Sequence, residues 1–350
     1  MQAPAKAFAF ACASPSRIAK VSVPLPPPLR AAIAGIAADV PGAEIARRAA
    51  AISSAYRAGH SSELAVACQA DIAAYLVARM PATFAATSAA LSASCELLPS
   101  FAPSSFIDLC AGPGTASFAA LDLWPRLAEL TLVDANGAFL DVARRLGSAA
   151  GLSALACATT LPSALRGALD RLAGADLVMM SYALVELPEA DIADLVLEMW
   201  RLSRALLVFV EPGTPEGVRR MLEAREVLVA SGANIIAPCP HRAPCPMQAP
   251  AWCHFSERLP RLRDHLRAKA ARLPFEDEPY IYLAVARMPG ELPPRARIVS
   301  RPRLSKAAIS CLVCTADGRL DDLVAARRDK RSYARLRRLD WGDAVLDIMG

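Results

Sequence analysis

Three cysteines lie close together in a proline-rich segment and form the most distinctive chemical pattern of the chain. Cys239, Cys245 and Cys253 have the spacing C-x5-C-x7-C, and five prolines stand in the same segment. Thiolates bind soft metal centres, and three of them need a fourth ligand to complete a tetrahedral or cubane site. Cys-Pro is typical of iron–sulfur loops, and this segment lacks the Cys-x-x-Cys pair of zinc ribbons. A [4Fe–4S] cluster is therefore favoured over zinc, and zinc over disulfides. The candidate fourth ligands are Cys311, Cys314, His241 and His254.

A glycine-containing turn, in the sequence FIDLCAGPGTASFAA, brings together Asp108, Cys110, Gly112 and Gly114. Glycines let the backbone approach a ligand closely, and the helix start that follows offers free N–H groups. Asp134 ends the next apolar run, where a carboxylate can accept hydrogen bonds from both ribose hydroxyls of an adenosyl ligand. The pattern resembles the nucleotide end of class I S-adenosylmethionine-dependent methyltransferases, with Cys110 in place of their first glycine. The alternatives are a dinucleotide-binding dehydrogenase, whose third glycine is missing here, and a turn that binds no ligand.

The segment SYALVEL, residues Ser181–Leu187, follows the fourth predicted strand, where methyltransferases line the acceptor pocket. We place Ser181 in the cofactor site, whereas Tyr182 and Glu186 either orient an acceptor or pack at a helix start. The segment has neither the Asn/Asp-Pro-Pro-Tyr motif of amino-group methylation nor a cysteine for attack on a pyrimidine. Because the sulfonium is already activated, methyl transfer needs alignment more than a base. The sequence therefore assigns no catalytic residue.

Short apolar runs that alternate with helical patterns must position these residues. The alternation predicts right-handed βαβ units and an α/β fold with a class I methyltransferase (Rossmann-like) sheet. Apolar residues at three- and four-residue spacing predict a helical subdomain before it. The proline run 24–28 is predicted to lie outside any helix, because proline lacks an N–H and has a fixed φ. The predicted strands are Phe106–Leu109, Leu130–Asp134, Ala154–Ala158, Asp176–Met180, Ala205–Val210, Ala233–Ala237 and Tyr280–Val285.

Composition and charge narrow the possible partners. The chain has 350 residues, of which 54% are apolar and 21% charged, so it can build a packed core and is not disordered throughout. No run approaches the 18 apolar residues of a membrane span, so no membrane partner is expected. The net charge of +5 is uneven, because residues 295–338 carry 13 Lys and Arg against 4 Asp and Glu. This basic segment predicts a polyanionic partner such as RNA, with a solvated charged face as the alternative. If the partner is RNA, we expect its phosphates to contact basic side chains of the segment, including Arg297, Arg301, Arg303, Lys306, Arg327, Arg328, Lys330 and Arg331.

The first 38 residues contain no Asp or Glu and carry Lys6, Arg17, Lys20 and Arg30. That composition resembles a weak organellar transit peptide, but a short irregular extension on a cytosolic protein is favoured. We therefore expect a cytoplasmic protein, with a mitochondrial location as the alternative.

Five segments together resemble the methyltransferase-like protein family of the mitochondrial small ribosomal subunit and its bacterial relatives. The segments are DLCAGPGTA, LVDANGAFL, APCPHRAPCPMQAPAWCHFSERLPR, FEDEPYIYLAVAR and CTADGRL followed by WGD. The resemblance implies a class I methyltransferase fold, a [4Fe–4S] cluster on four cysteines, and association with the small ribosomal subunit or its rRNA during assembly. It implies the cluster ligands Cys239, Cys245, Cys253 and Cys314, since the last matches the motif Cys-Thr-x-x-Gly. On a strand, Cys311 would then face the opposite side.

These predictions divide the chain into an irregular extension 1–28, a helical subdomain 29–100, a methyltransferase-like domain 101–290 and a basic, β-containing C-terminal extension 291–350. A cysteine-rich insertion occupies about 237–275 of the third part. The expected cofactors are S-adenosylmethionine and a [4Fe–4S] cluster, with zinc as the alternative. Two functions stay open for what we expect to be a monomer: an rRNA methyltransferase, and a non-catalytic assembly factor that binds small-subunit rRNA.

Overall fold

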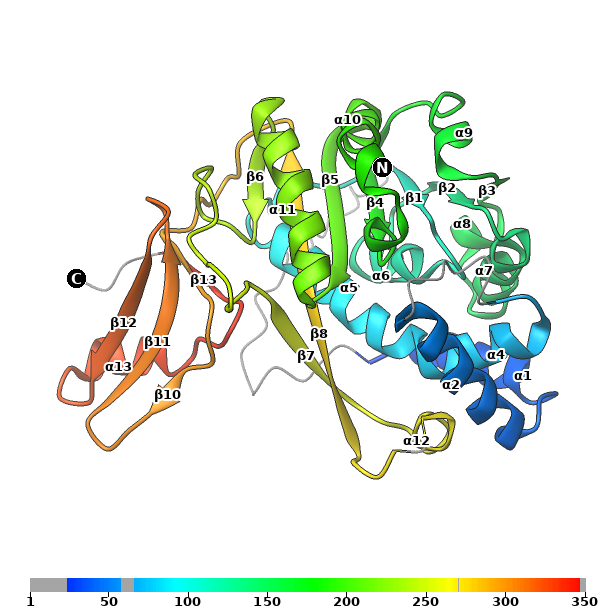
Figure 1. The fold of residues 1–350 in the computed structure, drawn as a ribbon, viewed down its shortest axis with the longest axis horizontal. Helices are drawn as coiled ribbons and strands as arrows, with labels where there is room; N and C mark the ends of the chain where they lie inside the picture. Colours follow the sequence, from blue (N-terminus) through cyan, green and yellow to red (C-terminus); the bar gives the residue numbers. More distant parts are fainter. Residues whose placement is uncertain (1–23, 58–65, 270, 347–350) are drawn as a thin grey trace, which may run out of the picture.

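The computed structural model describes residues 24–57, 66–269 and 271–346, so most of the predicted N-terminal extension lies outside the described residues. Its main feature is an eight-stranded sheet in the order β3-β2-β1-β4-β5-β8-β6, with β7 paired to β8 (Figure 1). The strands are β1 Ser105–Leu109, β2 Glu129–Asp134, β3 Thr159–Pro162, β4 Ala175–Ser181, β5 Ser203–Pro212, β6 Asn234–Ala237, β7 Phe255–Pro260 and β8 Phe275–Ala286.

The strand directions confirm the predicted α/β sheet. Strands β1 to β5 pair in parallel, and the strand order reverses between β1 and β4. Such a reversal is the switch point at which Rossmann-like folds bind their ligands. Strand β8 runs antiparallel to both β5 and β6. The glycine turn after β1 therefore lies at the edge of the sheet where a nucleotide-like ligand is expected.

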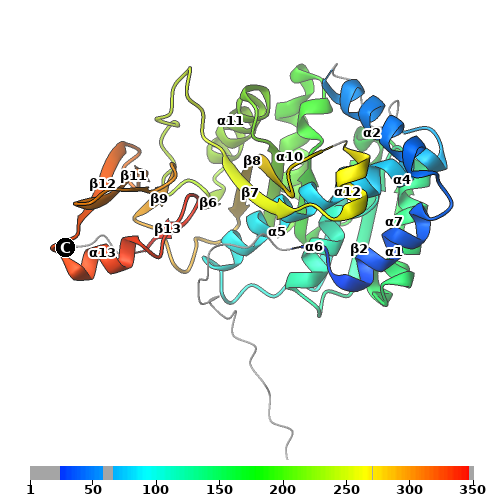
Figure 2. The same ribbon diagram turned by 90° about the horizontal axis from the view of Figure 1, so that it is seen from below.

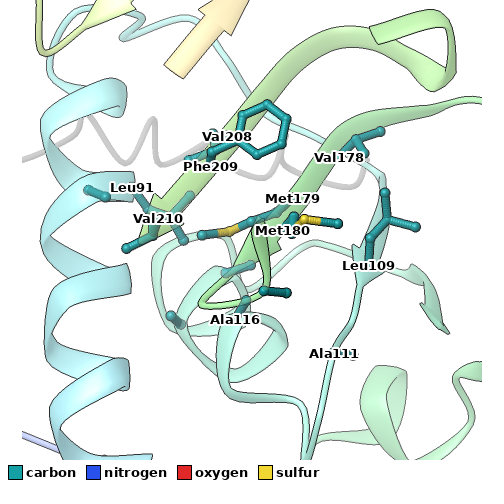
Figure 3. Packing of buried hydrophobic residues seen from close by; sticks show 14 of the residues in the cluster. Leu91, Leu109, Ala111, Ala116, Val178, Met179, Met180, Val208, Phe209 and Val210 are labelled. Carbon is teal, nitrogen blue, oxygen red and sulfur yellow. The ribbon is translucent and has the colours of Figure 1, made fainter. Parts of the chain in front are cut away.

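Helices cover both faces of this sheet. Helices α5 and α6 pack together on one face, and α10 and α11 pack together on the other (Figure 2). Twelve of the sixteen residues of α5 are buried, and Leu91 of this helix points toward the sheet beside Val210 (Figure 3). No helix among the described residues is long and apolar enough to span a membrane. The helices of this part of the chain are α5 Met80–Cys95, α6 Thr115–Leu123, α7 Gly137–Ala149, α8 Ser153–Ala156, α9 Leu165–Leu169, α10 Ile192–Leu202 and α11 Pro215–Ala230, with the 3-10 turns Leu184–Glu186 and Glu189–Asp191.

The N-terminal part of the described chain consists of the helices α1 Pro27–Ala37, α2 Gly42–Arg57 and α4 Gln69–Ala78, which confirms the predicted helical region. The prediction that the whole proline run lies outside a helix was wrong for Pro27 and Pro28, which begin α1. The first-turn N–H groups of a helix have no intrahelical acceptor, so a proline there loses no hydrogen bond.

The third strand begins later than predicted, so the predicted strand Ala154–Ala158 was wrong. Most of that segment belongs to the short helix α8, and β3 starts at Thr159. The alanines and leucine of the SALA sequence favour a helix, whereas the two β-branched threonines that follow favour a strand.

Strand β8 is longer than the predicted Tyr280–Val285, and its first half forms a hairpin with β7 that the sequence analysis missed. The pairing runs from Phe255 opposite Tyr280 to Pro260 opposite Phe275. Helix α12, Arg263–Ala268, lies between these strands and packs against α2 and α4 (Figure 1). Because β6 and β7 both pair with β8, one strand fixes both ends of the cysteine-rich loop between them.

The basic C-terminal part builds a second sheet beside the first, with its own small hydrophobic core. The sheet has the order β10-β11-β9-β13, with β12 paired to β11. Cys311 belongs to its core. The elements are β9 Ala296–Ile298, β10 Arg303–Leu304, β11 Ala308–Thr315, β12 Leu320–Ala326, α13 Lys330–Leu336 and β13 Ala344–Val345.

Candidate functional site

The turn after β1 has the backbone conformation that a glycine-rich loop needs. Gly112 and Gly114 have φ values of +53° and +80°, and Cys110 also lies in this left-handed region at +55°. A non-glycine residue in this region costs about 1–2 kcal/mol of conformational strain. Position 110 therefore keeps the backbone conformation of a glycine although a cysteine stands there. A Cβ on Gly114 would lie 3.1 Å from the Cβ of Ala143 in α7, so this glycine also permits close helix packing.

Asp134 lies at this turn, as its spacing predicted. Its Oδ2 accepts a hydrogen bond from the Gly112 N–H at 2.7 Å, and its Oδ1 accepts one from the Asn136 N–H at 2.8 Å. The residue is only 6% exposed. Each carboxylate oxygen has a further lone pair, so Asp134 can accept a ribose hydroxyl while it keeps these bonds.

Asp108 supports the turn from below rather than facing a ligand. It is fully buried, and its Oδ2 accepts hydrogen bonds from the N–H and the hydroxyl of Ser117 in α6, at 3.1 and 2.7 Å. Its Oδ1 has no partner, and burial raises the pKa of this carboxyl from 3.8 to about 7. We interpret Asp108 as a residue that ties β1 to α6 and so holds the turn in place.

Beside the turn, the end of β4 carries a buried polar cluster. Ser181 ends the strand next to Cys110, because Met180 stands in register with Leu109. Tyr182 follows with a φ of +58°, and its hydroxyl donates to Glu278 Oε1 at 3.1 Å. Strain of this kind in a tyrosine is typical of functional sites.

Three charged residues of this region had no assigned role in the sequence analysis. Glu211, at the end of β5, accepts hydrogen bonds from the N–H groups of Ala183 and Leu184 at 2.9 and 2.8 Å, and burial raises its pKa to about 7. The guanidinium of Arg79, between α4 and α5, lowers the pKa of Glu278 against the larger raising effect of burial. The Nε of Arg79 is buried without a partner. Glu211 could have been found in the sequence, because it is an acidic residue directly after the apolar run of a predicted strand.

The four predicted cysteine ligands line one small cavity of about 20 Å³. Cys239, Cys245 and Cys253 come from the loop between β6 and β7, and Cys314 comes from β11. Cys311 instead packs in the core of the second sheet, as the alternation of side chains along a strand predicted. The structure therefore brings together four thiols that are separated by up to 75 positions in the sequence.

Two buried arginines lie at this cavity, with Arg297 in its lining and Arg225 close to Cys239. Arg297 is 2% exposed and donates from Nε to the Pro238 carbonyl at 2.8 Å and from Nη1 to the Gly342 carbonyl at 3.0 Å. Arg225 is 3% exposed and donates to the carbonyls of His241 and Ala243 at 3.0 and 2.7 Å. Among the described residues, no carboxylate lines the cavity. Two cations without a lining anion suit a centre whose ligands are thiolates.

Burial also affects the acidity of three of these thiols. Burial raises the pKa of Cys314 to about 12 and also raises the pKa values of Cys239 and Cys253. The Nε2 of His241 lies 3.2 Å from the Cys314 sulfur. No three His, Cys, Asp or Glu side chains in the described ranges are arranged to hold a metal ion, so the metal site stays a prediction. Metal binding would have to displace protons from these thiols.

The basic C-terminal segment is exposed over most of its length, but not at Arg297. The sequence analysis expects that residue to contact RNA phosphates, and this was wrong because its side chain is buried against Pro238 and Gly342. Most other basic residues of the segment are exposed, including Arg301, Arg303, Lys306, Arg327, Arg328, Lys330 and Arg331.

A larger cavity, of about 550 Å³, lies between the N-terminal helices and the β7–α12 region. Its lining is mainly apolar and includes Ile33, Ile45 and Leu259. None of the predicted site residues lines it. Both candidate sites are therefore separate from the largest of these spaces.

Comparison with known proteins adds a family and its relatives. The family described as mitochondrial small ribosomal subunit Rsm22 matches residues 69–346. The human ribosome assembly protein METTL17, mitochondrial, is 29% identical over 291 residues, which are 77% of this chain and 61% of that protein. The chain thus spans about three fifths of the length of this relative.

Solved structures with a similar fold include two methyltransferases. An O-methyltransferase family protein from Burkholderia thailandensis is 15% identical, with a TM-score of 0.41, over 63% of this chain and 61% of that chain. The magnesium protoporphyrin IX methyltransferase of Synechocystis PCC 6803 with bound S-adenosylmethionine is also 15% identical, with a TM-score of 0.37, over 63% of this chain and 83% of that chain.

Proposed function

The chain belongs to the Rsm22 family of the mitochondrial small ribosomal subunit, and from this premise we propose that it is a methyltransferase-like protein of small-subunit assembly. We propose that it binds S-adenosylmethionine at the glycine turn, holds a [4Fe–4S] cluster on four cysteines and contacts small-subunit rRNA. The relative's name supports ribosome assembly and, for that protein, mitochondria. For this chain we propose the compartment in which its small subunit is assembled, bacterial cytoplasm or mitochondrion.

The convergence of four cysteines on one cavity is the observation that carries the proposal. Cys239, Cys245, Cys253 and Cys314 would hold the cluster, and Arg225 and Arg297 would balance its negative charge. When bound, the cluster supplies a cross-link between the loop and β11, and its binding free energy becomes folding free energy for that junction.

Metal analysis of anaerobically purified protein tests this part of the proposal. We expect iron and acid-labile sulfide in the wild type, with a broad visible absorption. Cys314→Ser should lose both, whereas Cys311→Ser is a matched control on the same strand, because its thiol lies in a separate core. One zinc ion per chain without sulfide would replace the cluster by a structural zinc site. Retention of iron in Cys314→Ser, with loss in Cys311→Ser, would show that the fourth ligand is wrong.

S-adenosylmethionine binding is supported by the turn. Gly112 and Gly114 keep a left-handed backbone, the N–H of Gly112 is held by Asp134, and Ser181 lies beside Cys110. We expect Asp108, Cys110, Gly112, Gly114, Asp134 and Ser181 to form the site, with Asp108 acting through the position of the turn. In the bound state the cofactor supplies an activated methyl group, and these residues orient it.

Non-catalytic assembly is the second candidate function, and the same region supports it. The strained Cys110 replaces a glycine, and the hydroxyl of the half-buried Tyr182 is engaged by the buried Glu278. Incubation with S-adenosylmethionine carrying a labelled methyl group and unmodified small-subunit rRNA distinguishes the two. Label in the RNA supports the methyltransferase. RNA binding and cofactor binding without label support the assembly factor.

A further inference from the structure

A row of aromatic side chains runs from the end of the cysteine loop, on either side of Cys253, to the C-terminal part, and none of them lines either candidate site. The rings of Trp252 and His254 are 5.8 Å apart and tilted by 32°, and those of His254 and Trp341 are 4.9 Å apart and edge to face. The guanidinium of Arg301 lies 5.8 Å from the ring centre of Trp341. Trp252 and His254 come from the loop before β7, and the other two residues come from the C-terminal part. The row therefore crosses the junction between the two sheets.

Trp252 is exposed and also fixed in position. It is 38% exposed, whereas Trp124 and Trp200 are 8% and 7% exposed. Its indole N–H donates to the carbonyl of Gly213 at 2.9 Å. Exposing the apolar face of a tryptophan to water is unfavourable. Because this side chain is already held in one position, a partner that stacks on it loses little conformational entropy. The ring of His254 lies next to it, and Trp341 in turn packs edge to face against His254.

Arg301 and the basic C-terminal segment to which it belongs supply positive charge at one end of the row. Arg301 is exposed, and in the part of the chain that the structure describes no carboxylate lies within ion-pair distance of its guanidinium. Residues 295–338 have a net charge of +9. An exposed indole at one end of the row and an exposed guanidinium at the other match a ligand that alternates flat rings and negative charges along its length.

We propose that Trp252, His254, Trp341 and Arg301 form a stacking platform for unpaired bases of RNA. Every base has a π-face that can stack on an indole, and the neighbouring guanidinium can contact the phosphate that follows. Duplex RNA hides its base faces, so the platform selects single-stranded segments, loops or bulges. This inference rests on the proposed rRNA binding and adds to it the class of RNA structure that is recognised.

Binding of short labelled RNAs to the full-length, metal-loaded protein tests the platform. The probes are a single-stranded 12-nucleotide RNA and the same sequence as a duplex, measured by fluorescence anisotropy at several salt concentrations. Trp252→Leu should weaken single-strand binding about 5- to 100-fold, as the loss of one stacked base does. Trp252→Phe should keep most of the affinity, because it keeps a ring and loses only the bond to Gly213. Leu304→Ala is the matched control, since Leu304 is 67% exposed in the same basic region but has no ring.

The salt dependence separates stacking from charge. Loss of an indole removes no phosphate contact, so the slope of log affinity against log salt should stay unchanged in Trp252→Leu. Wild-type affinity in Trp252→Leu, or equal affinity of the wild type for the duplex and the single strand, would overturn the platform and leave rRNA binding standing. Failure of the wild type to bind either probe or isolated small-subunit rRNA would overturn the proposed rRNA binding as well. Unchanged melting temperature and iron content show that the Trp252 variants are folded.

Discussion

Replacement of Arg297 should reveal how strongly the cysteine loop is attached to the C-terminal sheet. The guanidinium donates to the carbonyl of Pro238 on the loop side and of Gly342 on the C-terminal side, while its Nη2 has no partner. Arg297→Met keeps most of the volume but removes the charge and both hydrogen bonds. Arg297→Lys keeps the charge and can restore one of them.

The size of the effect follows from these contacts. A hydrogen bond from a charged donor contributes about 1.5–3 kcal/mol, and two of them are lost in Arg297→Met. The two bonds together contribute about 3–6 kcal/mol, and relief from burying a cation offsets roughly a third of this, so we expect a net destabilisation of about 2–4 kcal/mol. Arg297→Lys should cost roughly half as much. If the cavity holds a thiolate-bound cluster, loss of the buried cation should also reduce iron retention, and more in Met than in Lys.

Chemical denaturation of these variants measures the change in the free energy of unfolding, and iron analysis of the same samples measures iron retention. Arg295→Met is the matched control, because Arg295 precedes the same strand and is exposed. It should change neither stability nor iron content. Wild-type stability and iron content in Arg297→Met would refute the assigned role of the guanidinium. Equal iron loss in Arg297→Lys and Arg297→Met would show that iron retention depends on the hydrogen bonds of Arg297 and not on its charge.

Three further predictions concern the glycine turn. Since burial raises the pKa of Asp108 from 3.8 to about 7, the native state binds its proton more tightly, so wild-type stability falls as pH rises from about 4 to 7. The stability of Asp108→Asn relative to wild type should therefore rise over that window, by up to about 4 kcal/mol in urea titrations, and a constant difference would contradict this. Gly114→Ala should lower the melting temperature more than Gly112→Ala, because only the former meets a neighbouring Cβ, and equal losses would contradict this. Asp134→Asn should weaken calorimetric binding of S-adenosylmethionine by about 1–3 kcal/mol, with unchanged affinity as the contrary result.

The sequence predicted those parts of the fold in which neighbouring residues determine the structure. The apolar runs that became β1, β2, β4 and β5 were recognised, because buried parallel strands are continuous apolar segments. The failure at Ala154–Ala158 has a local cause, since an alanine-rich helix and a short apolar strand look alike over five residues. The first half of β8 was missed because FEDEP is charged and contains a proline, and it pairs only with β7 at the edge.

The candidate sites were predictable where a motif carries them and not where distant residues meet. Asp134 came to the glycine turn as its spacing indicated. The hydrogen bond between Tyr182 and Glu278 joins residues 96 positions apart, so no local sequence pattern predicts it. Arg297 was misjudged for a related reason, because charge counting along a segment cannot show which arginine a tertiary contact buries.

The position of β8 in the chain determines when the cysteine loop can form during synthesis. Strands β6 and β7 both pair with β8, which the ribosome makes after them, so three of the cysteines leave the exit tunnel before their loop has an anchor. Cys314 follows Cys239 by 75 residues, which is about 4–15 s at 5–20 residues per second. During that interval the nascent chain carries reactive thiols that no native structure protects. If the four cysteines hold a metal centre, its loading would therefore come at or after chain release, when the second sheet can pair its strands.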